Sequence, residues 1–522
     1  MKNFTLNIFV FCALLFCSQF SKGAPNIVII LTDDLGWGDV SYNGGPISTP
    51  NIDKLSNNGV QMNRFYSAPT CSPTRAALLT GINSLAVGVI RPIDNPTADR
   101  YGLPLKYKIM PQFFKDAGYQ TALSGKWHLG MFSDEYLPRN RGFDSTYGHL
   151  GGGIGYFDHA VAGRMDWHRN GEILYEDGYS TTLIADEAIR IIKNKSEESP
   201  LFLYIAFNAP HTPIEAEENI IKELGFIENE KERIYAANIL SLDREIGKII
   251  DSIESEGILE ETIIIFFSDN GPVFNIDPIA GVVASDILDS RGNTLGLKGS
   301  KGSTYEGGIR VPAIIYYKGV LEKSLSDKFF FVDDVLPTLL SATNTKANSS
   351  MFTGVDRWQD LIDNNIKPPI NVVTGNVIVN DERALFNDKW KLYYSKNVYT
   401  DSEKTYELYD ILNDPYEKKE LSAQYPDIFE SMKSALNEKP FVLEPPYFNP
   451  THAYLYGDYY RGISGSPWLK REYEEKDLHS PFVQNLVFVW ILFLAFKQIT
   501  IPSVLILIMG IIFLIRRKGA SS

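Results

Sequence analysis

The chain has 522 residues, 44% of them hydrophobic, and a formal net charge of −14 at pH 7. That length allows one large domain or two to three smaller ones. The acidic balance excludes a nucleic-acid-binding protein that works by bulk electrostatic attraction, so an anionic ligand would need a local cationic pocket.

The N-terminus has the pattern of a secretory leader. Lys2 precedes an apolar run from Phe4 to Phe16, and small and polar residues follow as far as Gly23. This pattern predicts a signal peptide over residues 1–23, with an uncleaved anchor as the alternative.

Near the C-terminus, two apolar runs precede a basic ending. The runs are Phe482–Phe496 and Ile499–Ile515, and Arg516-Arg517-Lys518 follows at once. We expect a membrane segment over residues 482–515, with one span, or two if the first run also crosses, and a cytoplasmic tail over 516–522. The rest of the chain would then be extracellular or lumenal, at the cell surface or in an endolysosome. A hydrophobic C-terminal helix of a soluble protein is the alternative.

The cysteine count raises a question. Of three cysteines, Cys12 and Cys17 lie in the predicted leader, so Cys71 is the single thiol of the mature chain. A lone thiol in an oxidising compartment is buried, paired between chains or chemically converted.

Strands and helices alternate up to about residue 345. Short apolar runs predict strands at Asn26–Leu31, Val60–Ser67, Tyr119–Ser124, Leu201–Phe207, Thr262–Phe267 and Val311–Tyr317. Amphipathic or capped segments predict helices at Thr49–Leu55, from Pro73 onward, and at Met110–Ala117, Ser180–Lys195, Glu230–Glu256 and Asp333–Thr343. The alternation predicts an α/β fold, with a large and mainly parallel sheet covered by helices on both faces.

The pattern changes beyond a polar stretch that ends at Ser350. Short strands are predicted at Asn371–Asn380, Arg383–Ser395 and Tyr406–Tyr409, and a helix at Pro426–Leu436. We therefore expect a catalytic domain over residues 24–350 and, over 351–480, a smaller antiparallel sheet with a helix, followed by a membrane-proximal segment.

Acidic and amide side chains follow two of the buried strands. Asp33 and Asp34 come directly after the first strand, and Asp269 and Asn270 follow the strand at Thr262–Phe267. Ligands of open α/β sheets lie at such strand ends. Their hard oxygen atoms suit Ca²⁺ or Mg²⁺, although a single Asp pair can also serve as a helix cap or turn.

A set of cationic side chains accompanies these acids. Cys71 stands at the entry to a helix, where backbone N–H groups and the helix dipole favour an anion. The cationic candidates are Arg75, Lys126, His128, His211 and Lys301. Lys126 and His128 would share one face of an extended segment, whereas a single loop histidine is more often structural. A hard cation beside a basic cluster describes a site for a tetrahedral oxyanion ester.

These residues stand in blocks that resemble the sulfatase family, most closely its B-type arylsulfatases. Cys71-Ser72-Pro73-Thr74-Arg75 is similar to the family's C-x-P-x-R signature. The other similar blocks are Leu31–Gly36, Gly125–Gly130, Ala209–His211, Ser268–Gly271 and Lys301–Gly308. The resemblance covers about residues 25–440 and implies an alkaline-phosphatase-like α/β fold.

The resemblance implies a covalent mechanism. A formylglycine-generating enzyme would oxidise Cys71 to Cα-formylglycine, whose hydrate attacks sulfur and then expels sulfate because its second hydroxyl can be deprotonated. Asp33, Asp34, Cys71, Asp269 and Asn270 would surround the divalent cation, expected to be Ca²⁺ rather than Mg²⁺. Arg75 and His128 would hold the hydrate, and Lys126, His211 and Lys301 would bind sulfate. His211 or Lys301 would protonate the leaving oxygen, and Lys301 is preferred over Lys298 because of its spacing from Glu306.

The substrate remains open within this resemblance. B-type relatives act on sulfated amino sugars, but this mature chain can form no internal disulfide, and Gly151-Gly152-Gly153 stands where relatives often place a serine. A phosphonate or phosphodiester hydrolase and an inactive, membrane-held binding protein are the alternatives. Asn194-Lys195-Ser196 and Asn348-Ser349-Ser350 are possible N-glycosylation sequences, so Asn194 and Asn348 are candidate glycan sites.

Overall fold

Strand β1 (Asn26–Thr32) lies inside a large mixed sheet, and all seven of its residues are buried. The computed structural model describes residues 23–93, 102–131, 133–161, 164–273, 292–377, 380–397 and 403–439. They belong to one compact unit, which comprises Met1–Asp94 and Arg100–Pro445. The predicted signal peptide, membrane segment and tail lie outside the described residues, apart from Gly23. In the part that is described, no helix has the length and apolar character needed to cross a bilayer.

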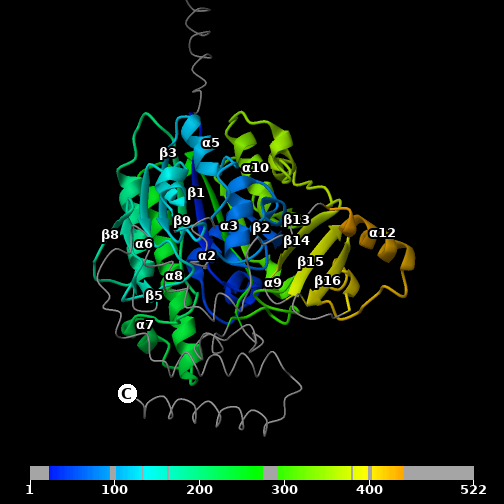
Figure 1. The fold of residues 1–522 in the computed structure, drawn as a ribbon. Coiled ribbons are helices and arrows are strands. Elements are labelled where there is room, and N and C mark those ends of the chain that lie inside the picture. Colours follow the sequence, from blue (N-terminus) through cyan, green and yellow to red (C-terminus); the bar gives the residue numbers. More distant parts are fainter. Residues whose placement is uncertain are drawn as a thin grey trace, which may run out of the picture. The chain divides into compact units, whose positions relative to one another are not determined.

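The large sheet has eleven strands in the order β11-β2-β12-β10-β1-β9-β3-β4-β7-β8, with β13 paired to β2. Their bounds are β2 Val60–Tyr66, β3 Gln120–Gly125, β4 Ser145–Gly148, β7 His168–Arg169, β8 Glu172–Ile173, β9 Leu201–Ala206, β10 Thr262–Ser268, β11 Arg310–Val311, β12 Ala313–Tyr317 and β13 Ser324–Phe331. Strands β10, β1, β9, β3 and β4 are parallel neighbours. β12 pairs antiparallel to β10, and β2 continues the sheet beyond it. Figure 1 shows β1, β9 and β3 side by side.

Helices cover both faces of this sheet. Their bounds are α2 Pro50–Ser56, α3 Cys71–Thr80, α4 Ser84–Val87, α5 Met110–Asp116, α6 Ser180–Lys193, α7 Glu218–Glu223, α8 Glu230–Ser255, α9 Glu306–Ile309, α10 Val335–Ala342 and α11 Trp358–Ile362. Val28 and Ile30 of β1 share one hydrophobic core with Ile184 of α6 and Ile246 of α8. On the other face, the ring of Phe114 in α5 stacks on Phe202 of β9. The alternation of inward positions along each strand therefore divides the core into two layers.

A second sheet, ordered β14-β15-β16-β17, is antiparallel throughout. Its strands are Val372–Val377, Asn380–Asn387, Trp390–Asn397 and Thr405–Asp410, and helix α12 (Pro426–Asn437) packs against it. The prediction of one strand over Arg383–Ser395 was wrong, because a turn at Asp388, with φ of 54°, separates β15 from β16. The predicted fold class, a large mixed sheet with a smaller antiparallel sheet, is confirmed.

A buried ionic group joins the two sheets. The Nζ of Lys391, on β16, lies 2.9 Å from Glu306 Oε1 of α9 and 2.8 Å from Glu417 Oε1. All three side chains are fully buried. Glu306 also accepts a hydrogen bond from Tyr66 of β2, so the group connects the second sheet with the interior of the first.

Candidate active site

The parallel pairing of β1 and β10 brings four polar residues to one sheet edge. Thr32 and Ser268 are paired at the ends of the two strands, so Asp33 and Asp34 emerge beside Asp269 and Asn270. The backbone N–H of Asp34 donates to Asp269 Oδ1 at 3.3 Å, and Asn270 Nδ2 donates to Asp34 Oδ1 at 2.7 Å. All four side chains are buried. The acids and the amide predicted from two separate strands therefore form one cluster.

Three oxygen atoms of this cluster have no hydrogen-bond partner among the described residues. They are Asp33 Oδ1, Asp34 Oδ2 and Asn270 Oδ1. Burial, together with the nearby Asp269, raises the pKa of Asp33 to about 7, although Lys126 opposes the shift. Buried oxygen atoms without donors are costly, and a hard divalent cation is the ligand that such atoms accept.

Three cationic side chains each contact one of the carboxylates. The guanidinium of Arg75 donates to Asp269 Oδ2 from Nε at 3.1 Å and from Nη2 at 2.7 Å. Lys126 Nζ lies 2.6 Å from Asp33 Oδ2, and Lys301 Nζ lies 2.6 Å from Asp34 Oδ1. Burial alone would raise the pKa of Asp34, but Lys301 and His211 bring it to about 2. The predicted cationic cluster and the predicted acidic cluster thus share one site.

Cys71 lies within this site at the first turn of α3. The helix begins at Cys71 itself, not at Pro73 as predicted, because the N–H of Thr74 already bonds to the carbonyl of Thr70. The Cys71 Sγ and one oxygen each of Asp33 and Asp269 lie within 4.8 Å of one another. Burial raises the pKa of the thiol to about 11 despite Lys126 and Lys301. An unmodified Cys71 would therefore be a protonated, weakly nucleophilic thiol at neutral pH.

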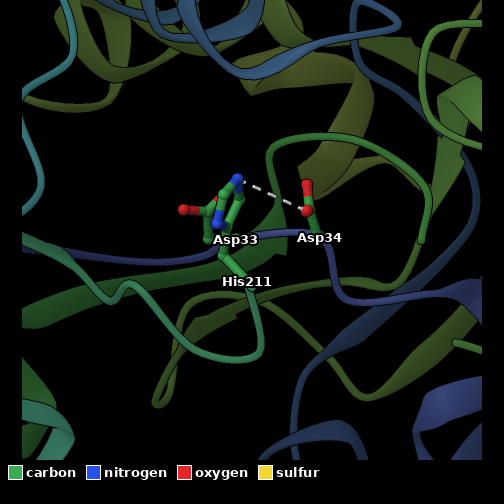
Figure 2. Close-up of side chains that lie close together, drawn as sticks. All are labelled: Asp33, Asp34 and His211. Atoms are coloured by element: carbon green, nitrogen blue, oxygen red, sulfur yellow. Dashed lines mark ion pairs between the residues drawn. The ribbon is translucent and has the colours of Figure 1, made fainter. Parts of the chain in front are cut away.

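His211 reaches the acids from the loop after β9. Its Nε2 lies 3.7 Å from Asp34 Oδ2, and its Nδ1 lies 2.6 Å from the carbonyl of Thr212. Figure 2 shows the ring directed at Asp34, with Asp33 beside it. Burial and Lys301 lower the pKa of His211 to about 4. With 19% of its side chain exposed, His211 stands where the site meets solvent.

His128 is placed by backbone contacts. Ser72 Oγ, in the first turn of α3, donates to the His128 carbonyl at 2.8 Å, and the His128 N–H donates to the Leu150 carbonyl at 3.1 Å. The prediction that Lys126 and His128 lie in an extended segment was wrong, because β3 ends at Gly125 and His128 has φ of 55°. Both side chains are nevertheless buried.

The two candidate lysines take different directions. Lys301 contacts Asp34, whereas Lys298 Nζ lies 3.0 Å from the Tyr409 hydroxyl and 3.3 Å from Glu407 Oε2. Lys298 also lies over the ring of Tyr305, 3.8 Å from its centroid. The structure thus places Lys301 in the site and Lys298 against the second sheet.

Sequence reasoning missed two buried side chains near the site. His149 is buried, and neither of its ring nitrogens has a hydrogen-bond partner among the described residues. Burial lowers the pKa of His149 well below its ordinary value. Asp166 is also buried and accepts hydrogen bonds from the backbone N–H groups of Leu150 and Gly151. No motif marks either residue, although both lie near the glycine-rich stretch that the sequence singled out.

The two candidate glycan sites are exposed. Asn194 follows the end of α6 and donates to the carbonyl of Arg190, and Asn348 accepts a hydrogen bond from the backbone of Ser350. Their glycosylation stays a prediction.

Comparison with known proteins establishes the class. The sulfatase family model matches residues 25–345, so the chain belongs to the sulfatase family. It is a sulfuric ester hydrolase, as its arylsulfatase relatives are. The resemblance seen in the motifs is confirmed.

Individual relatives cover most of the chain. Arylsulfatase J of Mus musculus is 29% identical over 87% of this chain and 81% of its own length. The N-acetylgalactosamine-6-sulfatase of Rattus norvegicus is 31% identical over 68% of this chain and 69% of its own. A crystal structure of Ps i-CgsB, in complex with k-i-k-neocarrahexaose, superposes with a TM-score of 0.72 at 27% identity, covering 86% of this chain and 99% of that one.

Proposed function

We propose that this protein hydrolyses sulfate esters of carbohydrates, with a formylglycine formed from Cys71 as nucleophile and a bound Ca²⁺. The observation that carries the proposal is the position of the Cys71 side chain, buried among Asp33, Asp269 and the cations that contact them. The Sγ atom stands where one of the two hydroxyl oxygens of a hydrated aldehyde would lie.

The residues present fit a hard divalent cation. The three buried oxygen atoms that lack a hydrogen-bond partner among the described residues belong to Asp33, Asp34 and Asn270. Asp269 completes an all-oxygen set that favours Ca²⁺ over a softer metal. When bound, the cation would polarise the sulfate oxygens and favour the ionised form of the nucleophile. These four residues and the side chain at position 71 would hold it.

The remaining residues act on charge and protons. Arg75, fixed by its two bonds to Asp269, stabilises negative charge at the nucleophile. Lys126 and Lys301 lie on the adjacent carboxylates and bind the sulfate oxygens. His211 or Lys301 protonates the leaving oxygen; because the pKa of His211 is about 4, His211 can do so only if the bound anionic ester raises that pKa. His128, whose carbonyl accepts a hydrogen bond from the first turn of α3, takes the proton whose loss releases sulfate. Hydration of the aldehyde gives two hydroxyl groups, one to attack and one to be deprotonated.

The proposed substrate class rests on one relative and one structural neighbour whose names refer to carbohydrates. One relative is a sulfatase of N-acetylgalactosamine 6-sulfate groups by name, and one structural neighbour holds a carrageenan-type oligosaccharide. We also propose that the chain follows the secretory route, meets a formylglycine-generating enzyme there, and stays at a membrane through residues 482–515. The N-terminal leader pattern supports this route.

Mass spectrometry of the peptide that contains Cys71 tests the nucleophile. Protein from the native host should show the mass loss that converts a thiol to an aldehyde, and Cys71→Ala should abolish hydrolysis of 4-nitrophenyl sulfate. An unmodified thiol in fully active protein would refute formylglycine catalysis. A strong preference for a phosphodiester of the same phenol over its sulfate would replace the substrate assignment.

Metal removal tests the cation. Chelation should lower activity and the melting temperature, and Ca²⁺ should restore both, because the cation relieves repulsion among buried carboxylates. An Asp34→Asn, Asn270→Ala variant should lose the melting-temperature response to Ca²⁺. Unchanged stability on chelation and on Ca²⁺ addition would contradict the assignment.

A further inference from the structure

One loop contacts both histidines of the proposed mechanism. It runs from His149 to Gly153, directly after β4. On one side, the N–H of His128 donates to the carbonyl of Leu150 at 3.1 Å, and the N–H of Trp127 donates to the carbonyl of His149 at 2.9 Å. The loop backbone thus fixes the backbone position of His128, three residues beyond the end of β3.

On its other side, the loop lies against the ring of His211. A methyl group added at Gly153 would lie 2.9 Å from both Cε1 and Nδ1 of His211. Such an approach is shorter than carbon atoms tolerate, so glycine at this position lets the backbone support the ring directly. A shift of the loop would therefore move the surroundings of both histidines together.

A single carboxylate fixes this loop. Asp166 Oδ1 accepts from the N–H of Leu150 at 3.0 Å, and Oδ2 accepts from the N–H of Gly151 at 2.7 Å. His168 Nε2, on β7, lies 2.9 Å from Asp166 Oδ1, and β7 is paired with β4 at Gly148. A methyl group at Gly151 would lie 2.9 Å from Asp166 Oδ2, so this contact is also close-packed.

We propose that Asp166 is a positioning residue of the sulfatase reaction, which holds His128 and His211 in register through the backbone of Leu150–Gly153. Charge-assisted bonds to two consecutive N–H groups leave the loop one orientation, and the contact with His168 Nε2 anchors the carboxylate to the sheet. The expected effect of Asp166 on catalysis rests on the proposed roles of the two histidines, whereas its effect on where they lie is independent of those roles.

Asp166→Asn, compared with Asp243→Asn, tests the proposal. Asp243 is a matched control, because its buried carboxylate accepts from the N–H groups of Asn51 and Ile52 on α2. In each variant an amide replaces a carboxylate that receives two backbone donors. We expect both variants to lose stability, but only Asp166→Asn to lower kcat, about 10- to 100-fold, with a smaller change in KM.

Leaving-group dependence gives a readout that a merely structural role would not move. If the loop places the group that protonates the leaving oxygen, Asp166→Asn and Gly153→Ala should lose more activity on phenyl sulfate than on 4-nitrophenyl sulfate, whose leaving group needs less protonation. Equal losses on the two esters, or a kcat for Asp166→Asn that matches Asp243→Asn, would overturn the proposal.

Histidine NMR separates this inference from the proposed function. The ring ¹H–¹³C signals of His128 and His211, assigned with single glutamine variants, should shift in Asp166→Asn and stay in place in Asp243→Asn. If the wild-type protein hydrolyses no sulfate ester, the proposed function fails, and shifted signals would still support the positioning role. Unshifted signals in Asp166→Asn would refute it.

Discussion

At the scale of single residues, the site is a set of one-to-one contacts between cations and carboxylates. Lys126 contacts Asp33, Lys301 contacts Asp34, and Arg75 contacts Asp269. A buried pair of this kind adds little net stability, since desolvation offsets the attraction. Its value lies in fixed charge at the place where a sulfate ester would bind.

The two lysines of the 298–301 segment offer an internal comparison. Lys301→Ala should lower kcat/KM for 4-nitrophenyl sulfate about 100- to 1,000-fold, because a donor to the sulfate is lost in a buried site. Lys298→Ala should change it less than about threefold, since its amino group contacts Glu407 and Tyr409 and its side chain is 38% exposed. Steady-state kinetics of both purified variants checks this. Equal losses would show that Lys301 has no special role.

At the scale of elements, the ends of parallel strands explain why so much of the site could be predicted. Asp33 and Asp269 follow continuous apolar runs, and parallel pairing places both at one edge. The burial of Asp166 and His149 beside the site could not be predicted, because their positions depend on a loop path that no local pattern encodes. The turn at Asp388 differs, because Asn387-Asp388 is a pair of turn-forming residues and the sequence did carry a local signal for it.

Strand β3 ends at a glycine that the fold requires. Gly125 has φ of 115°, and a methyl group there would lie 1.9 Å from the carbonyl oxygen of Ala206 on β9. Gly125→Ala should therefore cost about 3 kcal/mol or more of unfolding free energy. Gly118→Ala is the control, because φ is also positive, at 88°, but no non-neighbouring atom of the described residues lies within 4 Å of the added methyl group. It should cost about 1 kcal/mol. Urea denaturation compares the two variants. Similar midpoints would show that the loss of stability comes from the positive φ alone and not from the contact with Ala206.

The contribution of Asp166 to the free energy of unfolding should depend on pH. Although burial opposes it, the hydrogen bond from His168 and the charges of His168 and His149 lower the pKa of Asp166 to about 2. In the unfolded chain the group titrates near 3.8, so the unfolded state binds the proton first as pH falls. The stabilisation, roughly 2 kcal/mol, is present above pH 4 and is lost between about pH 4 and pH 2.

Unfolding free energies at pH 5 and pH 3 test this dependence. The difference between wild type and Asp166→Asn should shrink as the pH falls. A constant difference between pH 5 and pH 3 would mean that folding does not lower the pKa of Asp166.

At the scale of the described unit, the two sheets are joined through charge as well as through apolar packing. Tyr66 of β2 and Phe331 of β13 share a hydrophobic cluster with Phe386 and Tyr393 of the second sheet. Lys391 adds the buried bonds to Glu306 and Glu417. Since Glu306 follows the loop of Lys301 by five residues, the second sheet supports the segment that delivers this lysine.

Removing the buried lysine should reveal this support. Lys391→Met leaves two buried carboxylates without their cation and should cost about 3–5 kcal/mol of unfolding free energy. Lys389→Met breaks the partly exposed pair with Asp410 and should cost less than about 1 kcal/mol. Thermal unfolding followed by tryptophan fluorescence distinguishes them. A single shifted transition would indicate that both sheets unfold together, whereas an unshifted one would show that the buried group contributes nothing.

The order of the strands along the chain also determines when the neighbours of Cys71 are synthesised. Asp269, which receives the guanidinium of Arg75, comes 194 residues after it in the chain. At a synthesis rate of about 5–20 residues per second, roughly 10 to 40 s pass between the appearance of Cys71 and that of its first carboxylate neighbour from β10. The partners of β2 in the sheet, β11, β12 and β13, follow Asp269 in the chain and are synthesised later still. In the completed fold, Cys71 is 2% exposed. Any enzyme that converts this thiol therefore has to act before the later strands have been synthesised and the fold has buried Cys71.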